Sequence, residues 1–300
     1  MSKIINKIMQ LKEEREAIIL AHNYQPGEIQ DLADYVGDSF GLSRLAAESK
    51  ARVILFCGVR FMAESAALLA PGREVLLPVK EAGCPMADTI TSEDVRRLKK
   101  EYPGRPVVAY VNTTAEVKAE SDICCTSSNA VQVVNSLSED ELIFVPDKNL
   151  AHYVDQQTEK RIIPWEGGCI THHRLKIDDL RRVRELHPEA EILVHPECPP
   201  EIVREADFVG GTGDILDYAQ QTATKHLFIG TEVGIIHRLN KENPKKSFFL
   251  LSPELVCPGM KLTSLEDVFI ALRDNKHLIE IDARIQQPAV KTLDRMLAIN

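Results

Sequence analysis

The chain has 300 residues, 44% of them hydrophobic, and a formal net charge of −9 with a pI near 5.6. This acidic balance leaves no basic face for nucleic acid, and no apolar run approaches the ~20 residues that a membrane-spanning helix needs. Seven cysteines without an export signal predict a reducing cytoplasm, where thiols serve metal or redox chemistry rather than disulfides.

The N-terminal part of the chain predicts one small α/β unit. An amphipathic pattern at the start indicates a helix rather than a signal peptide, and the apolar run 17–21 then predicts a buried strand. Residues 53–69 predict another strand, a tight turn and an amphipathic helix, and a last apolar run covers 75–78. Cys84 follows in the sequence EAGCPMAD, so the unit ends at a cysteine in a loop.

The same order recurs twice. The matching runs are 106–109, 142–158 and 162–165 before Cys169, and 191–194, 227–243 and 248–251 before Cys257. These three cysteines lie 85 and 88 residues apart, an interval too long for a solenoid repeat. Continuous apolar strands that alternate with helices predict small parallel sheets. We therefore predict three tandem homologous α/β domains over residues 1–85, 86–171 and 172–300, the last with a C-terminal helical tail.

Three slots of the repeat hold a polar residue in every copy. They are His22, Tyr110 and His195 where the first strand ends, Tyr24, Asn112 and Glu197 two residues later, and Ser39, Ser127 and Thr212 seventeen residues on, where a helical pattern starts. Ligands of open parallel sheets gather outside the carboxyl ends of the strands, so we expect these nine side chains around one cavity. Hydroxyls at helix starts suit carboxylate or phosphate, and His, Tyr and Glu can transfer protons. The slots therefore predict an anion site with acid/base chemistry.

Taken singly, these residues have plainer interpretations. The hydroxyl residues fit ordinary helix N-caps, the histidines fit satisfied core residues, and the tyrosines fit core aromatics. Other repeated acids, Glu28, Glu116 and Glu201 in predicted first helical turns and Asp34, Asp122 and Asp207 at strand entries, are interpreted as structural. The coincidence of polar type in all three copies favours the shared site.

The three repeated cysteines predict a metal centre. Cys84, Cys169 and Cys257 each stand beside Gly or Pro in a loop, where backbone can approach a ligand closely. Three protein ligands on a four-iron cluster or on a zinc ion leave one coordination position free. The other cysteines, Cys57, Cys124, Cys125 and Cys198, are interpreted as small buried hydrophobes, although the adjacent pair leaves a redox role open.

The chain resembles the quinolinate synthase family, the iron–sulfur enzymes of de novo NAD biosynthesis. The resemblance covers essentially the whole chain and rests on several motifs together: ILAHNYQ (19–25), GDS (37–39), YVN (110–112), CTSSNAV (125–131), PDKNLAHYV (146–154), VHPEC (194–198), TEVGIIHRL (231–239) and CPGMK (257–261). It implies three α/β domains around a pseudo-threefold axis, with a central [4Fe-4S] cluster that acts as a Lewis acid. It also implies condensation of iminoaspartate with dihydroxyacetone phosphate to quinolinate, with loss of phosphate and two waters, and functional coupling to an L-aspartate oxidase.

The resemblance assigns roles to the residues of the repeat. Cys84, Cys169 and Cys257 become cluster ligands; Tyr24, Glu197 and His195 become catalytic residues; and the substrate contacts are His22, Ser39, Tyr110, Asn112, Ser127, His195, Glu197 and Thr212. The chain departs from the family pattern at a few positions. Gly211 stands where a serine is common, which removes one hydroxyl from the anion site, and Gly259 stands where Asn is frequent.

Two alternatives come from other functional classes. One is an iron–sulfur or zinc sensor that binds a small dicarboxylate, and such a sensor has no need of an acid/base pair such as Tyr24 and Glu197. The other is a zinc hydrolase, which three thiolates fit poorly because hydrolytic zinc is usually held by His and carboxylate.

Overall fold

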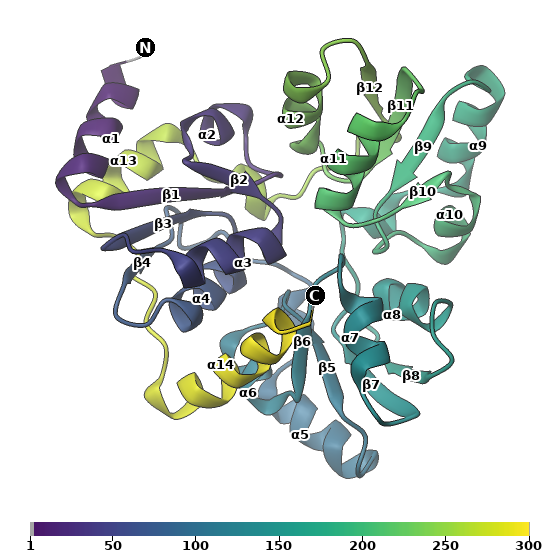
Figure 1. Cartoon of the computed structure of the whole chain (residues 1–300), viewed down its shortest axis with the longest axis horizontal. Coiled ribbons are helices and arrows are strands. Elements are labelled where there is room, and N and C mark those ends of the chain that lie inside the picture. The colour runs from purple at the N-terminus through teal and green to yellow at the C-terminus, as the bar shows by residue number, and fades with distance from the viewer. Residues whose placement is uncertain (1–2, 300) are drawn as a thin grey trace.

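The computed structural model describes residues 3–299. Its strands form three separate four-stranded parallel sheets, ordered β2-β1-β3-β4, β6-β5-β7-β8 and β10-β9-β11-β12. Each sheet with its helices makes one lobe, and the three lobes surround a common centre (Figure 1). The prediction of three tandem α/β units with small parallel sheets is therefore confirmed.

The three units share one order of elements. Unit 1 contains α1 (Lys3–Glu14), β1 (Ala17–His22), α2 (Gly27–Leu32), β2 (Tyr35–Gly37), α3 (Ser39–Glu48), β3 (Val53–Cys57), α4 (Arg60–Leu69) and β4 (Glu74–Leu76). Unit 2 contains α5 (Ser92–Glu101), β5 (Val107–Tyr110), α6 (Ala115–Glu120), β6 (Ile123–Cys125), α7 (Ala130–Ser136), β7 (Glu141–Val145), α8 (Lys148–Asp155) and β8 (Arg161–Pro164). Unit 3 contains α9 (Ile177–Leu186), β9 (Glu191–Val194), α10 (Pro200–Glu205), β10 (Phe208–Val209), α11 (Thr212–Gln221), β11 (His226–Gly230), α12 (Ile235–Glu242) and β12 (Ser247–Leu250).

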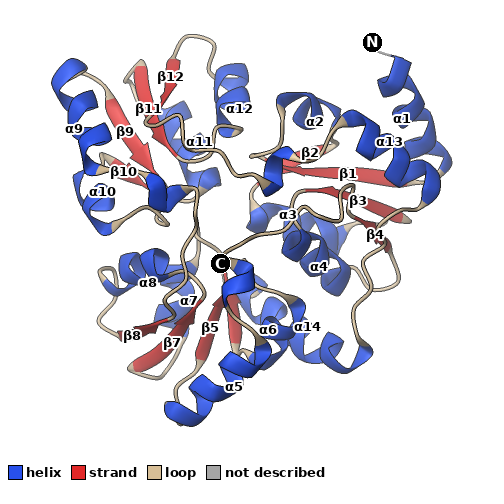
Figure 2. Ribbon diagram, turned by 180° about the vertical axis from the view of Figure 1, so that it is seen from behind, coloured by secondary structure: helices blue, strands red, loops and turns tan. Residues whose placement is uncertain are grey.

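A short 3₁₀ turn follows the cysteine of each unit. These turns are η1 (Ala87–Thr89), η2 (His172–Arg174) and η3 (Gly259–Lys261). The central strands of each sheet are buried on both faces, which explains why they read as continuous Val, Ile and Leu. Seen from behind, loops from all three units meet around the centre of the molecule (Figure 2).

A repeated aspartate ties the first two strands of each unit together. Each of the three carboxylates accepts an N–H from the central strand: Asp34 from Ile19 at 2.8 Å, Asp122 from Val107 at 2.8 Å and Asp207 from Ile192 at 2.7 Å. Glu28, Glu116 and Glu201 lie in the first turns of α2, α6 and α10. These acids have the structural places that their sequence positions predict.

The C-terminal tail leaves the third unit and packs on the other two. Helix α13 (Leu265–Asp274) lies against α1 and β3, and its residues Val268, Ala271 and Leu272 join the core around Ile8. Helix α14 (Ala283–Leu297) lies against α6, β6 and α4 (Figure 1). The tail therefore connects units 1 and 2 rather than extending unit 3. Within residues 3–299, no helix is long and apolar enough to cross a membrane.

Candidate functional site

One central cavity receives every site residue that the sequence predicts. It has a volume of about 70 Å³ and draws its lining from all three units. The twelve predicted residues that line it are His22, Tyr24, Ser39, Cys84, Tyr110, Asn112, Ser127, Cys169, His195, Glu197, Thr212 and Cys257. The repeat thus brings equivalent positions to one place, as parallel sheets around a common centre require.

The three cysteines that line the cavity share one local geometry. Each stands just before a 3₁₀ turn, and backbone N–H groups at or directly before the start of that turn lie at its sulfur: Met86 and Ala87 at Cys84, His172 at Cys169, and Gly259 and Met260 at Cys257. Burial raises the pKa of Cys84 to about 12, and burial also raises the pKa values of Cys169 and Cys257. Half-buried thiols beside N–H donors suit metal ligation, in which the metal and those donors offset the thiolate charge.

Buried carboxylates hold two of the three cysteine loops. Asp147 accepts the N–H of Cys169 at 3.0 Å, and its other oxygen caps α8 at Leu150. Glu232 accepts the N–H of Cys257 at 3.0 Å, and it also binds the Lys261 ammonium at 2.9 Å.

Asp147 and Glu232 are fully buried and occupy the same slot of the repeat, just after the third strand of the unit. In unit 1 that slot is Gly58, and there the Arg60 N–H donates to the Ala82 carbonyl at 2.8 Å. The Cys84 loop is therefore held by a backbone bond instead of a carboxylate.

Two imidazoles present a fixed donor to the cavity. His22 Nδ1 accepts the N–H of Tyr24 at 3.1 Å, and His195 Nδ1 accepts the N–H of Glu197 at 3.2 Å. With Nδ1 as the acceptor, the proton of each neutral ring lies on Nε2. Burial lowers the pKa of both histidines to about 3, so both rings are neutral at pH 7. They therefore act as N–H donors without carrying a charge.

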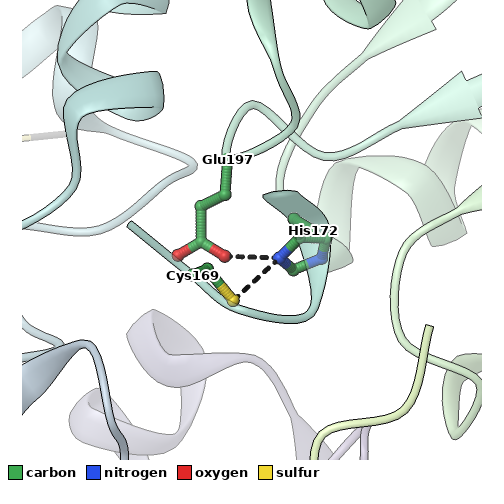
Figure 3. A group of neighbouring side chains, drawn as sticks. All are labelled: Cys169, His172 and Glu197. Carbon is green, nitrogen blue, oxygen red and sulfur yellow. Dashed lines mark hydrogen bonds and ion pairs between the residues drawn. The ribbon is translucent and has the colours of Figure 1, made fainter. Parts of the chain in front are cut away.

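A chain of hydrogen bonds connects Glu197 to Tyr24. Glu197 Oε2 lies 2.6 Å from His172 Nδ1 (Figure 3). On the other side of the ring, His172 Nε2 lies 2.8 Å from Thr231 Oγ1. Thr231 Oγ1 lies 2.5 Å from the Tyr24 hydroxyl, which also accepts from Thr212 Oγ1 at 3.0 Å. Proton transfer along this chain requires the hydroxyl groups to rotate and the His172 ring to exchange its proton between Nδ1 and Nε2.

Opposing effects set the charge of Glu197. Burial disfavours its charged form, but the His195 and His172 rings and the hydrogen bonds from His172 and Tyr110 outweigh burial and lower the pKa of Glu197. The carboxylate is therefore ionised at neutral pH. Burial raises the pKa of Tyr24 well above its usual value, so the phenol keeps its proton. An ionised acceptor and a protonated donor thus stand at opposite ends of one chain.

The hydroxyl residues of the third slot are not the caps of their helices. The N-cap positions belong to Asp38 before α3, Asn129 before α7 and Gly211 before α11. The hydroxyl of Ser39 therefore stays available to the cavity, and that of Thr212 donates to the Tyr24 hydroxyl instead of capping its helix. Helix α7 begins three residues after Ser127, because the Asn129 side chain accepts the N–H of Thr126 at 2.7 Å and delays the first helical turn. The expected helix start at Ser127 is thus corrected, although Ser127 still lines the cavity.

Neutral groups dominate the cavity lining. Among the residues that the structure describes, no Lys or Arg lines it, and Lys261 reaches only Glu232 and the Tyr24 carbonyl from behind. Two buried acceptors, Glu197 Oε1 and Asn112 Oδ1, have no partner within residues 3–299. A bound anion would thus meet hydroxyls, imidazole N–H groups and the first turns of α3 and α11.

Gly211 and Gly259 allow close contacts between units. A Cβ on Gly211 would lie 2.4 Å from Ser128 Oγ, so the Ser128 hydroxyl occupies the space of a side chain at position 211 and also lines the cavity. A Cβ on Gly259 would lie 2.3 Å from the Gly83 carbonyl oxygen. The loops of Cys257 and Cys84 therefore touch through these two glycines.

Sequence reasoning missed His172 and Thr231, the middle of the proton chain. His172 stands three residues after its cysteine, a slot that holds Ala87 in unit 1 and Met260 in unit 3. Comparison of the three copies therefore gives no signal for it. The spacing Cys-x-x-His within CITHH, which is typical of metal-ligand pairs, was the available signal.

Comparison with known proteins gives one consistent family. The family described as "Quinolinate synthetase A protein" matches residues 6–298. A protein of Alkaliphilus metalliredigens named quinolinate synthase is 54% identical, with 99% of each chain covered. A protein of the same name from Caldicellulosiruptor bescii is 52% identical, and the alignment covers 97% of each chain. Another from Methanosarcina barkeri is 49% identical, and the alignment covers 99% of this chain and 98% of the relative.

Proposed function

The chain belongs to the quinolinate synthase family, whose members are enzymes of NAD biosynthesis, and on that premise we propose that it condenses iminoaspartate with dihydroxyacetone phosphate to form quinolinate, with loss of phosphate and two waters. The observation that carries the proposal is a single cavity that receives three thiols, a set of neutral anion donors and a connected proton chain. The reaction needs all three, because it holds anions, moves protons and expels oxygen leaving groups.

The proposed cofactor is a [4Fe-4S] cluster held by Cys84, Cys169 and Cys257. The donor set fits this group, since three half-buried thiols with N–H donors at their sulfurs line one cavity. When bound through three protein ligands, such a cluster keeps one iron open to act as a Lewis acid on a substrate oxygen. Because burial raises the thiol pKa values, protons leave the cysteines when iron binds.

The polar slots bind the anionic groups of the substrates. Ser39 and Thr212 stand in the first turns of α3 and α11, where free N–H groups and a hydroxyl face a carboxylate or phosphate together. Ser127 and Ser128 add hydroxyls from unit 2. His22 and His195 donate from Nε2, and their neutrality prevents a tight ion pair that would hold the product.

Tyr24 and Glu197 serve as the acid/base residues. The phenol of Tyr24 gives a proton to a leaving oxygen, and the Thr231 hydroxyl replaces it with a proton drawn from the imidazole side of the chain. Ionised Glu197 accepts a substrate proton at Oε1, the oxygen without a partner among the described residues. The same chain then redistributes these protons between successive steps, which suits a reaction with two dehydrations.

The test is an anaerobic preparation with about four iron and four sulfide per chain, assayed for quinolinate from the two substrates. We expect product only from the loaded protein. We expect Tyr24→Phe and Glu197→Gln to lower the turnover number by about 10²-fold or more, with iron content unchanged. Tyr35→Phe, at an exposed tyrosine outside the cavity, is the matched control and keeps full activity.

A fully loaded protein that makes no quinolinate would overturn the proposal. Retained ligand binding with no turnover in the wild-type protein would favour a dicarboxylate sensor instead. The proposed substrate imine hydrolyses readily in water, so we also propose functional coupling to an L-aspartate oxidase in the cytoplasm, which supplies the imine where it is consumed.

A further inference from the structure

Three possible metal ligands of different chemistry converge at one edge of the cavity. His172 Nδ1 lies 2.6 Å from Glu197 Oε2 and 3.3 Å from Cys169 Sγ, and the three ligand atoms all lie within 4.8 Å of one another. Figure 3 shows the side chains pointing toward a common point. Cys169 and His172 come from the loop after β8, whereas Glu197 comes from the loop after β9, so the group joins units 2 and 3.

Two further observations indicate a ligand at this point. Glu197 is only 3% exposed, yet its Oε1 has no hydrogen-bond partner among the described residues. His172 Nε2 is paired with Thr231 Oγ1 at 2.8 Å, the second hydrogen bond that normally orients a metal-binding imidazole. The ring is thus fixed with Nδ1 facing the thiol and the carboxylate.

The distances suit a single tetrahedral zinc ion. Bonds of about 2.0–2.1 Å to nitrogen, about 2.3 Å to sulfur and about 2.0–2.2 Å to oxygen place tetrahedral neighbours about 3.4–3.6 Å apart. The nitrogen–sulfur distance of 3.3 Å already approaches this value. The carboxylate oxygen, now at 2.6 Å, needs to move back by less than about 1 Å, and nothing in the described residues holds its partner oxygen.

We propose that, when no iron–sulfur cluster is bound, one zinc ion binds Cys169 Sγ, His172 Nδ1 and a carboxylate oxygen of Glu197, with the fourth position open to the cavity. Binding releases the proton of the thiol, while the single proton of the neutral ring occupies Nε2, donates to Thr231 and leaves Nδ1 free to bind the ion. One thiolate and one carboxylate neutralise the divalent charge, so the buried site is neutral as a whole. Thiolate and imidazole favour zinc over Mg²⁺ and Ca²⁺, and zinc also stands above Fe²⁺ in the order of affinity.

Zinc at this site has a consequence that rests on the proposed function. The ion and the cluster both need Cys169, so they exclude each other. Zinc also takes His172 and Glu197 out of the proton chain. The zinc-loaded chain is therefore an inactive form that neither binds a cluster nor turns over substrate. Zinc thus competes with iron and sulfide during cluster assembly.

The experiment titrates zinc into the full-length chain stripped of iron, in competition with a coloured chelator. We expect one tightly bound zinc per chain, and at least tenfold weaker binding in Cys169→Ser, His172→Gln and Glu197→Gln. Cys84→Ser is the matched control, since it removes a cavity thiol that the proposed site does not use, and its affinity stays at the wild-type value. Equal loss in Cys84→Ser and Cys257→Ser, with no loss in His172→Gln, would place zinc on the three thiols and overturn the proposal.

Cobalt(II) gives a second measurement that does not depend on affinity. One thiolate ligand produces one sulfur-to-cobalt charge-transfer band, which we expect to disappear in Cys169→Ser and to persist in Cys84→Ser and Cys257→Ser. A band intensity that falls by a third in each single cysteine variant contradicts the proposed site. The two proposals fail separately: zinc binding without quinolinate formation by the iron-loaded protein rejects the reaction, and quinolinate formation without zinc binding rejects the zinc site.

Discussion

The cysteine loops of units 2 and 3 differ from that of unit 1 in what holds them. Asp147 and Glu232 tie their loops to the end of a strand of the same unit through a buried carboxylate. The Cys84 loop has Gly58 at that slot and relies on a backbone bond from Arg60 and on contact with the neighbouring loop at Gly259. Units 2 and 3 thus position their cysteines from within, whereas unit 1 depends partly on unit 3.

We expect the largest effect on stability from removing one of the two carboxylates that hold the cysteine loops. Asp147→Ala leaves the N–H groups of Cys169 and Leu150 unpaired in a buried site, so we expect a loss of about 2–4 kcal/mol in the free energy of unfolding. We also expect faster loss of iron to a chelator, measured by absorbance. Glu64→Ala is the matched control, because Glu64 is a buried carboxylate that accepts the Ala115 N–H at 3.0 Å and does not bond to the Cys169 loop. Equal iron loss in both variants would show that the tether has no specific role.

The contact between the loops of units 1 and 3 is tested at Gly259. Gly259→Ala places a Cβ 2.3 Å from the Gly83 carbonyl oxygen, so we expect about 1–3 kcal/mol of destabilisation and a lower iron content. Gly83→Ala is the control from the same contact. Its Cβ meets nothing closer than the Glu81 carbonyl oxygen at 3.8 Å, and its stability should stay within about 0.5 kcal/mol of wild type. Unchanged stability and iron content in Gly259→Ala would mean that the position of the Cys84 loop does not depend on its contact with unit 3.

The units also differ in their response to acid. At the end of their first strands, units 1 and 3 carry His22 and His195, whereas unit 2 carries Tyr110. Burial lowers both histidine pKa values to about 3. Between pH 6.5 and pH 3 these two histidines are therefore protonated in the unfolded chain but remain neutral in the folded chain. Stability should therefore fall as the pH decreases through this window, by about 1.4 kcal/mol per pH unit for each histidine.

Chemical denaturation across that pH window measures the effect. His22→Gln should make the slope shallower by about one proton, and Tyr110→Phe should leave it unchanged. Identical slopes in the wild-type protein and in His22→Gln would contradict neutral burial of the ring.

We expect the smallest effect from adding a carboxylate at Gly58, the slot in which units 2 and 3 carry Asp147 and Glu232. At Gly58 an added Cβ meets Met62 and Phe56 side-chain atoms at 3.1 Å, which can shift. Because the Arg60 N–H already ties this loop through the Ala82 carbonyl, we expect the stability of Gly58→Asp to differ from that of Gly58→Ala by less than about 1 kcal/mol. A stabilised loop with slower iron loss would show that the Cys84 loop can adopt the arrangement of the other two units.

Much of the fold and the site could be predicted because the repeat carries the same residue types at equivalent places. His22 and His195, or Cys84 and Cys257, occupy places that the other copies support. Comparison of the units could not predict residues whose type occurs in one unit only. His172 has Ala87 and Met260 as its counterparts, and only its contacts with Glu197 and Thr231 in the structure indicate its role. The helix that follows Ser127 was placed too early, because a side-chain bond from Asn129 overrides the pattern that the other units follow.

The packing of the tail reverses the order in which the units can complete their cores. Unit 1 is synthesised first, but Val268, Ala271 and Leu272 of α13 fill its core, and these residues leave the ribosome after units 2 and 3. Until then one face of the first sheet is covered by α1 and α2 alone. A chain cut short after Cys257 would thus contain all three thiols and still lack a finished first unit. The core of the first unit is therefore completed by one of the last helices of the chain.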